Sequence, residues 1–180
     1  MTPAELALTA LAYGLGCLNA GYYLLRWRDG RDIRELGSGN AGARNAGRVM
    51  GPGGFALVFA LDAAKGLGAV LAARCWAPDA AALCAVVVVL GHVVPVQLQG
   101  RGGKGVATAL GALAALDGIV LTVLAAAFLL LRLLLRHTTA AGLLAFGCAT
   151  AFALALRPMD TGFAMLALLA LLAFTHRPGR

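Results

Sequence analysis

Two polar, glycine-rich segments of the chain could bind an anion. The first reads Gly37-Ser38-Gly39-Asn40-Ala41-Gly42-Ala43-Arg44-Asn45-Ala46-Gly47-Arg48. Its first three glycines fit a dinucleotide-binding fingerprint, which we reject because that fingerprint requires a preceding strand in a parallel sheet. Backbone N–H groups and the donors of Ser38, Asn40, Asn45 and Arg48 can still hold a phosphate. The alternative is a flexible connector with helix-capping residues, and these residues alone leave both readings open.

The second segment surrounds a lysine with glycines. It reads Gly100-Arg101-Gly102-Gly103-Lys104-Gly105-Val106-Ala107-Thr108 and opens an apolar stretch. Backbone donors, a helix N-terminus and a cation would favour an anion together. Gly105 stands where a nucleotide-binding P-loop needs Ser or Thr, so nucleotide hydrolysis is not indicated. A basic loop that only sets membrane orientation explains the charge but not four glycines, so we predict an anion site here.

Other polar residues give weaker signals. Asp62 and Lys65, three residues apart, are expected to form a structural ion pair on one helix face. His92 and His176 could exchange protons near neutral pH, with helix capping and membrane-interface packing as the alternatives, and His137 is expected at the interface. The chain has neither C-x-x-C nor H-E-x-x-H spacing, so we expect free thiols at its four cysteines, no metal and no cofactor.

Composition determines which elements must position these residues. Of 180 residues, 61% are hydrophobic and 13% charged, with mean hydropathy +0.84. These values exclude an ordinary soluble domain. Apolar runs predict about seven transmembrane helices in one domain, 1–180, of an all-α integral membrane protein. The expected spans are 4–25, 54–74, 80–97, 105–116, 119–135, 140–156 and 161–174.

Basic residues predict how these spans are oriented. Seven spans with the N-terminus outside place most of them in the inner loops, with Arg74 and Arg157 alone in the outer ones. The inner set is Arg26, Arg28, Arg31, Arg34, Arg44, Arg48, Arg101, Lys104, Arg132, Arg136, Arg177 and Arg180. This asymmetry follows the positive-inside rule and predicts a cytoplasmic C-terminus, with the basic charge indicating no nucleic acid. The first apolar run has no basic region before it, which argues against a cleaved signal peptide.

At these residues the sequence resembles the bacterial membrane enzymes that transfer an acyl group from acyl phosphate to glycerol 3-phosphate. The segments that carry the resemblance, in order, are G-S-G-N-A-G-A-R-N-A-G-R, D-A-A-K-G at 62–66, G-H-V-V-P-V-Q-L-Q-G-R-G-G-K-G-V-A-T-A-L-G at 91–111, L-R-H-T-T at 135–139 and His176-Arg177. Departures from the family pattern are Arg44 in place of Thr, Thr139 in place of Ser, and Pro178-Gly179-Arg180 in place of an acidic residue and an asparagine.

The resemblance implies an acyltransferase of phospholipid biosynthesis that yields lysophosphatidic acid and phosphate at the cytoplasmic face of the bacterial inner membrane. Its expected partners are acyl phosphate, glycerol 3-phosphate and membrane lipid. Catalytic roles are expected for His176 and Ser38. Substrate binding is expected from Asn40, Asn45, Arg48, His92, Gly102, Gly103, Lys104, Gly105, Thr108 and Thr139. The alternatives are a catalytically silent paralogue that binds lipid phosphate or a partner, and a small transporter, although transporter sites lie nearer the midplane.

Overall fold

The chain is all-helical across residues 1–177, the part that the computed structural model describes. The helices are α1 (Pro3–Cys17), α2 (Ala20–Asp29), α3 (Ala43–Trp76), α4 (Ala81–Val93), α5 (Val106–Leu116), α6 (Gly118–Leu134), α7 (Thr138–Leu156) and α8 (Met159–Thr175). Short 3-10 turns are η1 (Ile33–Glu35), η2 (Pro78–Ala80) and η3 (Val96–Leu98). The expected all-α class is confirmed.

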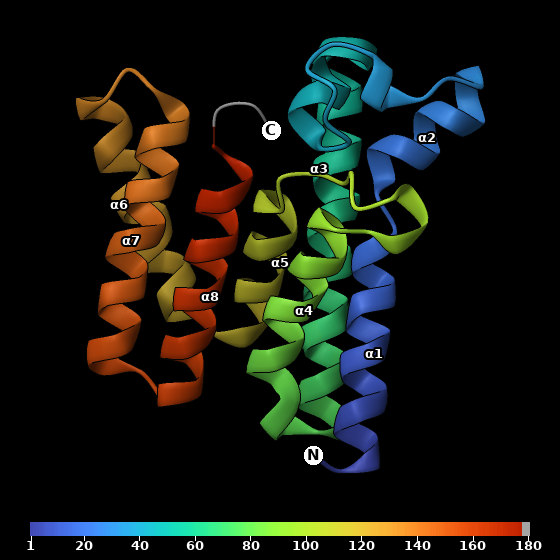
Figure 1. The fold of residues 1–180 in the computed structure, drawn as a ribbon. Coiled ribbons are helices and arrows are strands. Elements are labelled where there is room, and N and C mark those ends of the chain that lie inside the picture. The colour runs from blue at the N-terminus through green and yellow to red at the C-terminus, as the bar shows by residue number, and fades with distance from the viewer. Residues whose placement is uncertain (178–180) are drawn as a thin grey trace.

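Most helices lie along one direction. Figure 1 shows α1 and α4 running toward one end of the molecule, and α3 and α5 running back. By length and composition, α3, α7 and the segment Pro78–Leu98 could each cross a membrane, while α5, α6 and α8 are shorter apolar helices. The seven-span count stays a prediction.

The first expected span, 4–25, is wrong as a continuous helix. α1 ends at Cys17, and α2 leaves at an angle to it (Figure 1). The carbonyls of residues 16–18 accept hydrogen bonds from the side chains of Lys65, Asn19 and Gln97 at 2.6–3.2 Å. These side-chain donors, of which Lys65 and Gln97 are distant in the chain, replace the partners that a helix end lacks, so the chain can turn within an apolar region.

α3 is kinked where it enters the bundle. Gly51 has φ +78°, which a glycine adopts without strain, and Pro52 follows. Proline cannot donate the helical hydrogen bond, so the two pieces meet at an angle. The short piece before the kink belongs to the polar end and carries Arg44 and Arg48, in a region that the sequence suggested was a loop.

Small residues allow the helices to approach closely. A Cβ on Gly111 of α5 would overlap the Ala63 carbonyl of α3, and one on Gly66 would overlap the Thr108 carbonyl. Gly16 of α1 meets Gly91 of α4 in the same way. Such contacts are how helices associate where lipid offers no hydrophobic driving force.

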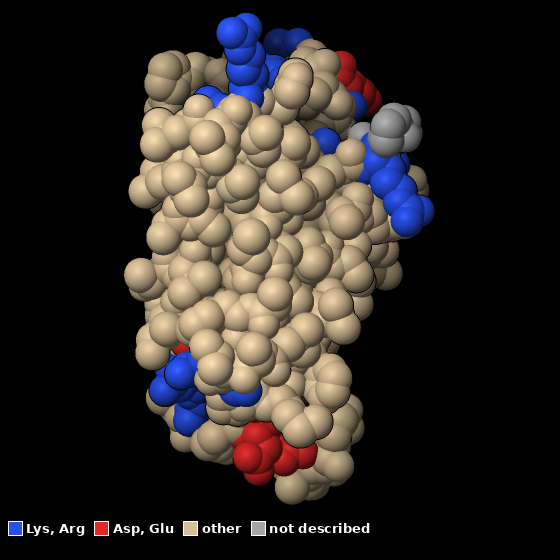
Figure 2. Space-filling model, turned by 90° about the vertical axis from the view of Figure 1, so that its left-hand side faces the viewer, with Lys and Arg blue, Asp and Glu red and all other residues tan. Residues whose placement is uncertain are grey.

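Most of the basic residues lie at one end of the molecule. The loops with basic residues, at 30–42, 94–105 and 135–137, lie at the same end as the last residues of α8 (Figure 1). On the face that Figure 2 shows, an apolar region without charged side chains lies between the two ends. At the far end Arg157 pairs with Asp117 at 2.7 Å. The grouping inferred from the sequence is therefore seen in space, except for Arg180, which lies outside the described residues.

Candidate functional site

The glycine–asparagine segment is folded around Asn45, which is only 1% exposed. Its side-chain amide donates to the carbonyls of Ile33, Leu36 and Asn40 at 3.0, 2.9 and 2.9 Å. Its Oδ1 accepts the N–H of Ser38 at 2.8 Å. Asn45 therefore determines the shape of this loop, while the hydroxyl of Ser38 stays at the exposed surface.

The glycine–lysine segment is attached to α4, to α8 and to Asn19 in the turn between α1 and α2. The N–H of Gly102 donates to the Val93 carbonyl at 3.2 Å, and that of Gly103 lies 3.1 Å from both the His92 carbonyl and Asn19 Oδ1. The Lys104 carbonyl accepts the hydroxyl of Thr175, at the end of α8, at 3.1 Å. The backbone on both sides of Lys104 is thus held before any ligand arrives.

The glycine–asparagine and glycine–lysine segments are in contact. The sequence predicted only that both lie on the same side of the membrane. A Cβ placed on Gly42 would lie 3.9 Å from both the Cα of Gly103 and the backbone nitrogen of Lys104. Arg44 and Arg48 both lie within the first two turns of α3 after Gly42. Nη1 of Arg44 donates to the hydroxyl of Thr139 on α7 at 3.3 Å, so α7 also contributes to this place.

We call Arg44, Arg48, Lys104 and His176 the basic cluster. Across residues 1–177, no carboxylate forms an ion pair with any of its members. Partial burial lowers the pKa of Lys104, and the positive charges of Arg44 and Arg48 lower it further. Cations that repel one another without a carboxylate among them favour an anion at the same place.

His176 lies at the edge of this cluster, and its Nε2 has no hydrogen-bond partner among residues 1–177. Burial lowers its pKa, as do the charges of Lys104 and Arg44, although its hydrogen bond to the Leu172 carbonyl acts in the opposite direction. Nδ1 lies 2.8 Å from that carbonyl. Because a carbonyl only accepts, we assign the proton to Nδ1, which leaves Nε2 as an acceptor near neutral pH.

The structure brings some expected site residues together and places others beneath them. Ser38, Asn40, Arg48, Lys104, Thr139 and His176 lie at the polar end. His92 and Thr108 are buried at 2% and 0% exposure, and Gly102, Gly103 and Gly105 are packed against α4 and its following turn. Substrate binding by any of them stays a prediction.

Sequence reasoning missed three residues that contact the site. Arg44 could have been found from the sequence, because its spacing of four from Arg48 places both residues on one helix face. Asn19 and Thr175 had no such signal, since their partners lie 84 and 71 residues away in the chain.

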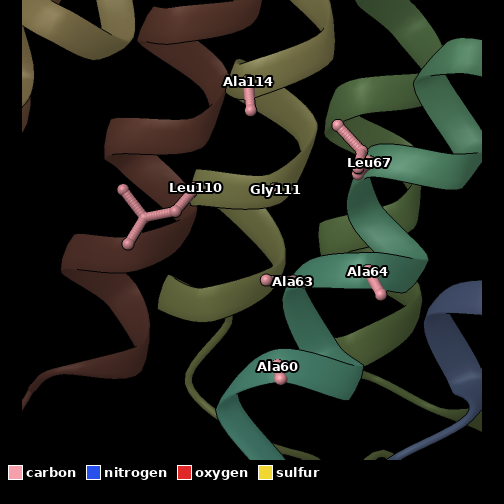
Figure 3. Close-up of a pocket in the computed structure, with 7 residues that line it drawn as sticks. All are labelled: Ala60, Ala63, Ala64, Leu67, Leu110, Gly111 and Ala114. Carbon is pink, nitrogen blue, oxygen red and sulfur yellow. The ribbon is translucent and has the colours of Figure 1, made fainter.

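An apolar groove runs between α3 and α5. It measures about 380 Å³ and is lined by Ala60, Ala63, Ala64, Leu67, Leu110, Gly111 and Ala114. Figure 3 shows this lining without a polar side chain. Such a groove can accept hydrocarbon but no charged group.

Comparisons with known proteins agree with this architecture. A model of the glycerol-3-phosphate acyltransferase family matches residues 6–179. A glycerol-3-phosphate acyltransferase of Synechococcus elongatus is 47% identical over 146 residues, which cover 76% of this chain and 70% of that protein. Glycerol-3-phosphate acyltransferase 1 of Deinococcus radiodurans is 43% identical over 183 residues, covering 98% and 90%.

Two solved structures are also similar. One is PlsY (YgiH), an integral membrane glycerol 3-phosphate acyltransferase, in its glycerol 3-phosphate form. It superposes with TM-score 0.87 and 34% identity, covering 96% of this chain and 88% of that one. The other, in a lysophosphatidic acid form, superposes with TM-score 0.84 and 33% identity over the same shares.

Proposed function

The chain belongs to the glycerol-3-phosphate acyltransferase family, and we propose that its basic cluster is where the reaction takes place. It is an integral membrane enzyme that acylates glycerol 3-phosphate to lysophosphatidic acid. The observation that supports the proposed site is the meeting of two glycine-rich segments beside three cations that have no carboxylate partner within residues 1–177. The acceptor and product of this reaction both carry a phosphate.

The proposed acyl donor is acyl phosphate, which would bring a second phosphate to the same place. Arg48 and Lys104 are the proposed phosphate ligands, because charge-assisted hydrogen bonds to phosphate are strong. Ser38, Asn40 and Thr139 would add hydroxyl and amide contacts. Asn45 and His92 would act by shaping the two loops, since both side chains are buried.

The proposed chemistry is direct transfer. A glycerol hydroxyl oxygen attacks the carbonyl carbon of the acyl phosphate, the new ester C–O bond forms, and the C–O bond to phosphate breaks. Phosphate leaves with the electron pair and takes up the hydroxyl proton. His176 Nε2 would accept a hydrogen bond from the hydroxyl and orient it, and holding both reactants in place supplies much of the rate gain.

The groove between α3 and α5 is the proposed position of the acyl chain. Both helices lead away from the polar end. With a rise of about 1.5 Å per residue, Leu110 lies about 6 Å along α5 from its first residue. A chain that enters at the cluster would therefore reach apolar surface within a few carbons.

We propose seven spans with the N-terminus outside and the cluster at the cytoplasmic face of the bacterial inner membrane. The support is the concentration of basic residues at the cluster's end of the molecule. The whole chain would form one membrane domain, with lipid around its apolar belt.

The test is product formation by purified protein in detergent. Acyl phosphate with glycerol 3-phosphate should yield lysophosphatidic acid, and acyl-CoA should not replace the donor. Lys104→Gln should lower kcat/KM for glycerol 3-phosphate by about a hundredfold, as expected for a lost charged contact. Arg101→Gln, in the same loop, is the matched control and should retain activity. Product formed with acyl-CoA in place of acyl phosphate would contradict the proposed donor. Full activity of Lys104→Gln would show that Lys104 is not part of the site.

A further inference from the structure

A buried group of charges lies beneath the glycine–lysine segment. Nζ of Lys65 lies 2.8 Å from Asp62 Oδ1 and 2.8 Å from His92 Nδ1. The exposed fractions of the Lys65, Asp62 and His92 side chains are 8%, 1% and 3%. The ion pair expected from the sequence is therefore present, but it has a third member from a different helix.

Lys65 also connects this group to the broken first helix. Its ammonium donates to the carbonyls of Gly16 and Leu18 at 3.0 and 2.6 Å. Three ammonium protons thus face four acceptors, which lie on α3, on α4, on α1 and at Leu18 just beyond the end of α1. A charge inside an apolar bundle needs such partners. If Lys65 only joined helices, these contacts would be sufficient for its role.

His92 extends the group to the site. Because Lys65 can only donate, His92 Nδ1 accepts, and the ring proton is assigned to Nε2. A Cβ on Gly103 would overlap His92 Nε2, so the ring lies directly against that glycine. The His92 carbonyl accepts the N–H of Gly103 at 3.1 Å. One side chain thus contacts Lys65 on one edge and the residue before Lys104 on the other.

We propose that Asp62, Lys65 and His92 form a positioning triad that determines where Lys104 meets the substrate phosphate. This inference rests on the proposed role of Lys104. Asp62 holds the Lys65 ammonium, Lys65 holds the His92 ring through Nδ1, and His92 sets the backbone of Gly103. None of the three touches the reactants. Loss of Lys65 lets the ring and the glycine backbone move, which misplaces the Lys104 ammonium.

A double-mutant cycle tests the proposal. Lys65→Met removes the ammonium and retains most of the side-chain volume. It should raise KM for glycerol 3-phosphate and lower kcat/KM by about tenfold, because a displaced cation binds phosphate less well. In a Lys104→Gln background the same change should lower kcat/KM by less than about twofold, because residues that act through one another are not additive. Lys65→Arg, which retains the charge, should recover part of the loss.

Arg157→Met is the matched control, since it removes the cation of another ion pair at the far end of the bundle. It should leave KM unchanged in both backgrounds. Thermal unfolding of every variant in detergent separates stability from positioning. Asp62→Asn, which changes charge with little change in volume, repeats the cycle if Lys65→Met does not fold.

Two results would overturn the triad. One is an equal loss from Lys65→Met, or from Asp62→Asn, in both backgrounds. The other is failure of both variants to fold while Arg157→Met folds, which would make the group purely structural. Full activity of Lys104→Gln by itself would instead contradict the proposed function, so the two failures are distinguishable.

Discussion

Lys104 is held through its own backbone and that of Gly103 rather than through its side chain. Its carbonyl accepts from Thr175, and the preceding N–H lies within reach of His92 and Asn19. Across the described residues 1–177 its ammonium forms no ion pair, so it can meet an anion while the backbone that carries it is fixed. This arrangement makes small changes in the loop backbone costly for binding.

Gly103→Ala tests that statement directly. The added methyl group would overlap the His92 ring, so either the ring or the loop must shift. We expect kcat/KM for glycerol 3-phosphate to fall by about tenfold or more, because a displacement near 1 Å is enough to lose much of a positioned contact. Gly142→Ala, at a helical glycine with open space, is the control and should retain activity. Normal kinetics of Gly103→Ala would show that the loop tolerates the shift.

The acid side of the pH profile should report on His176. Its pKa lies below the ordinary 6.5, so the ring is neutral at neutral pH and becomes protonated only as pH falls through the lowered value. Arg44→Gln removes one of the charges that lower this pKa, which should therefore rise. The acid limb of kcat/KM, measured between about pH 5 and 8, should move to higher pH. Arg101→Gln should leave the limb in place, and an unchanged limb in Arg44→Gln would disconnect His176 from the rate.

At the scale of elements, apolar runs predicted five helices within a few residues of their ends, from α4 to α8. They failed at α1 because its end depends on Lys65, 47 residues beyond Leu18. The sequence left open whether the polar loop was a flexible connector, and Asn45 closes it through contacts that composition cannot reveal. Glycine context predicted Lys104 and Arg48 as site residues, whereas the contacts that hold the backbone around Lys104 are long-range and had no local signal.

The groove between α3 and α5 makes an element-scale prediction about chain length. Ala60→Phe would place a ring in a space that is lined mostly by alanine. Acyl phosphates of about 16 carbons should lose activity relative to those of about 8, because the longer chain needs more of the groove. Leu71→Phe, on the exposed side of α3 outside the groove, should leave the ratio unchanged. An equal effect on both donors would place the chain elsewhere.

For the whole molecule, the two charged ends predict which one faces the cytoplasm. Cys75 is exposed near the end of α3 remote from the basic cluster, and Glu35 is exposed at the cluster's end. In intact cells stripped of the outer membrane, a membrane-impermeant maleimide should label Cys75. A Glu35→Cys, Cys75→Ser variant should be labelled only after permeabilisation, because the basic end is retained inside. The opposite pattern would place the cluster outside, away from a cytoplasmic supply of glycerol 3-phosphate, and would overturn the proposed orientation while leaving the site's chemistry intact.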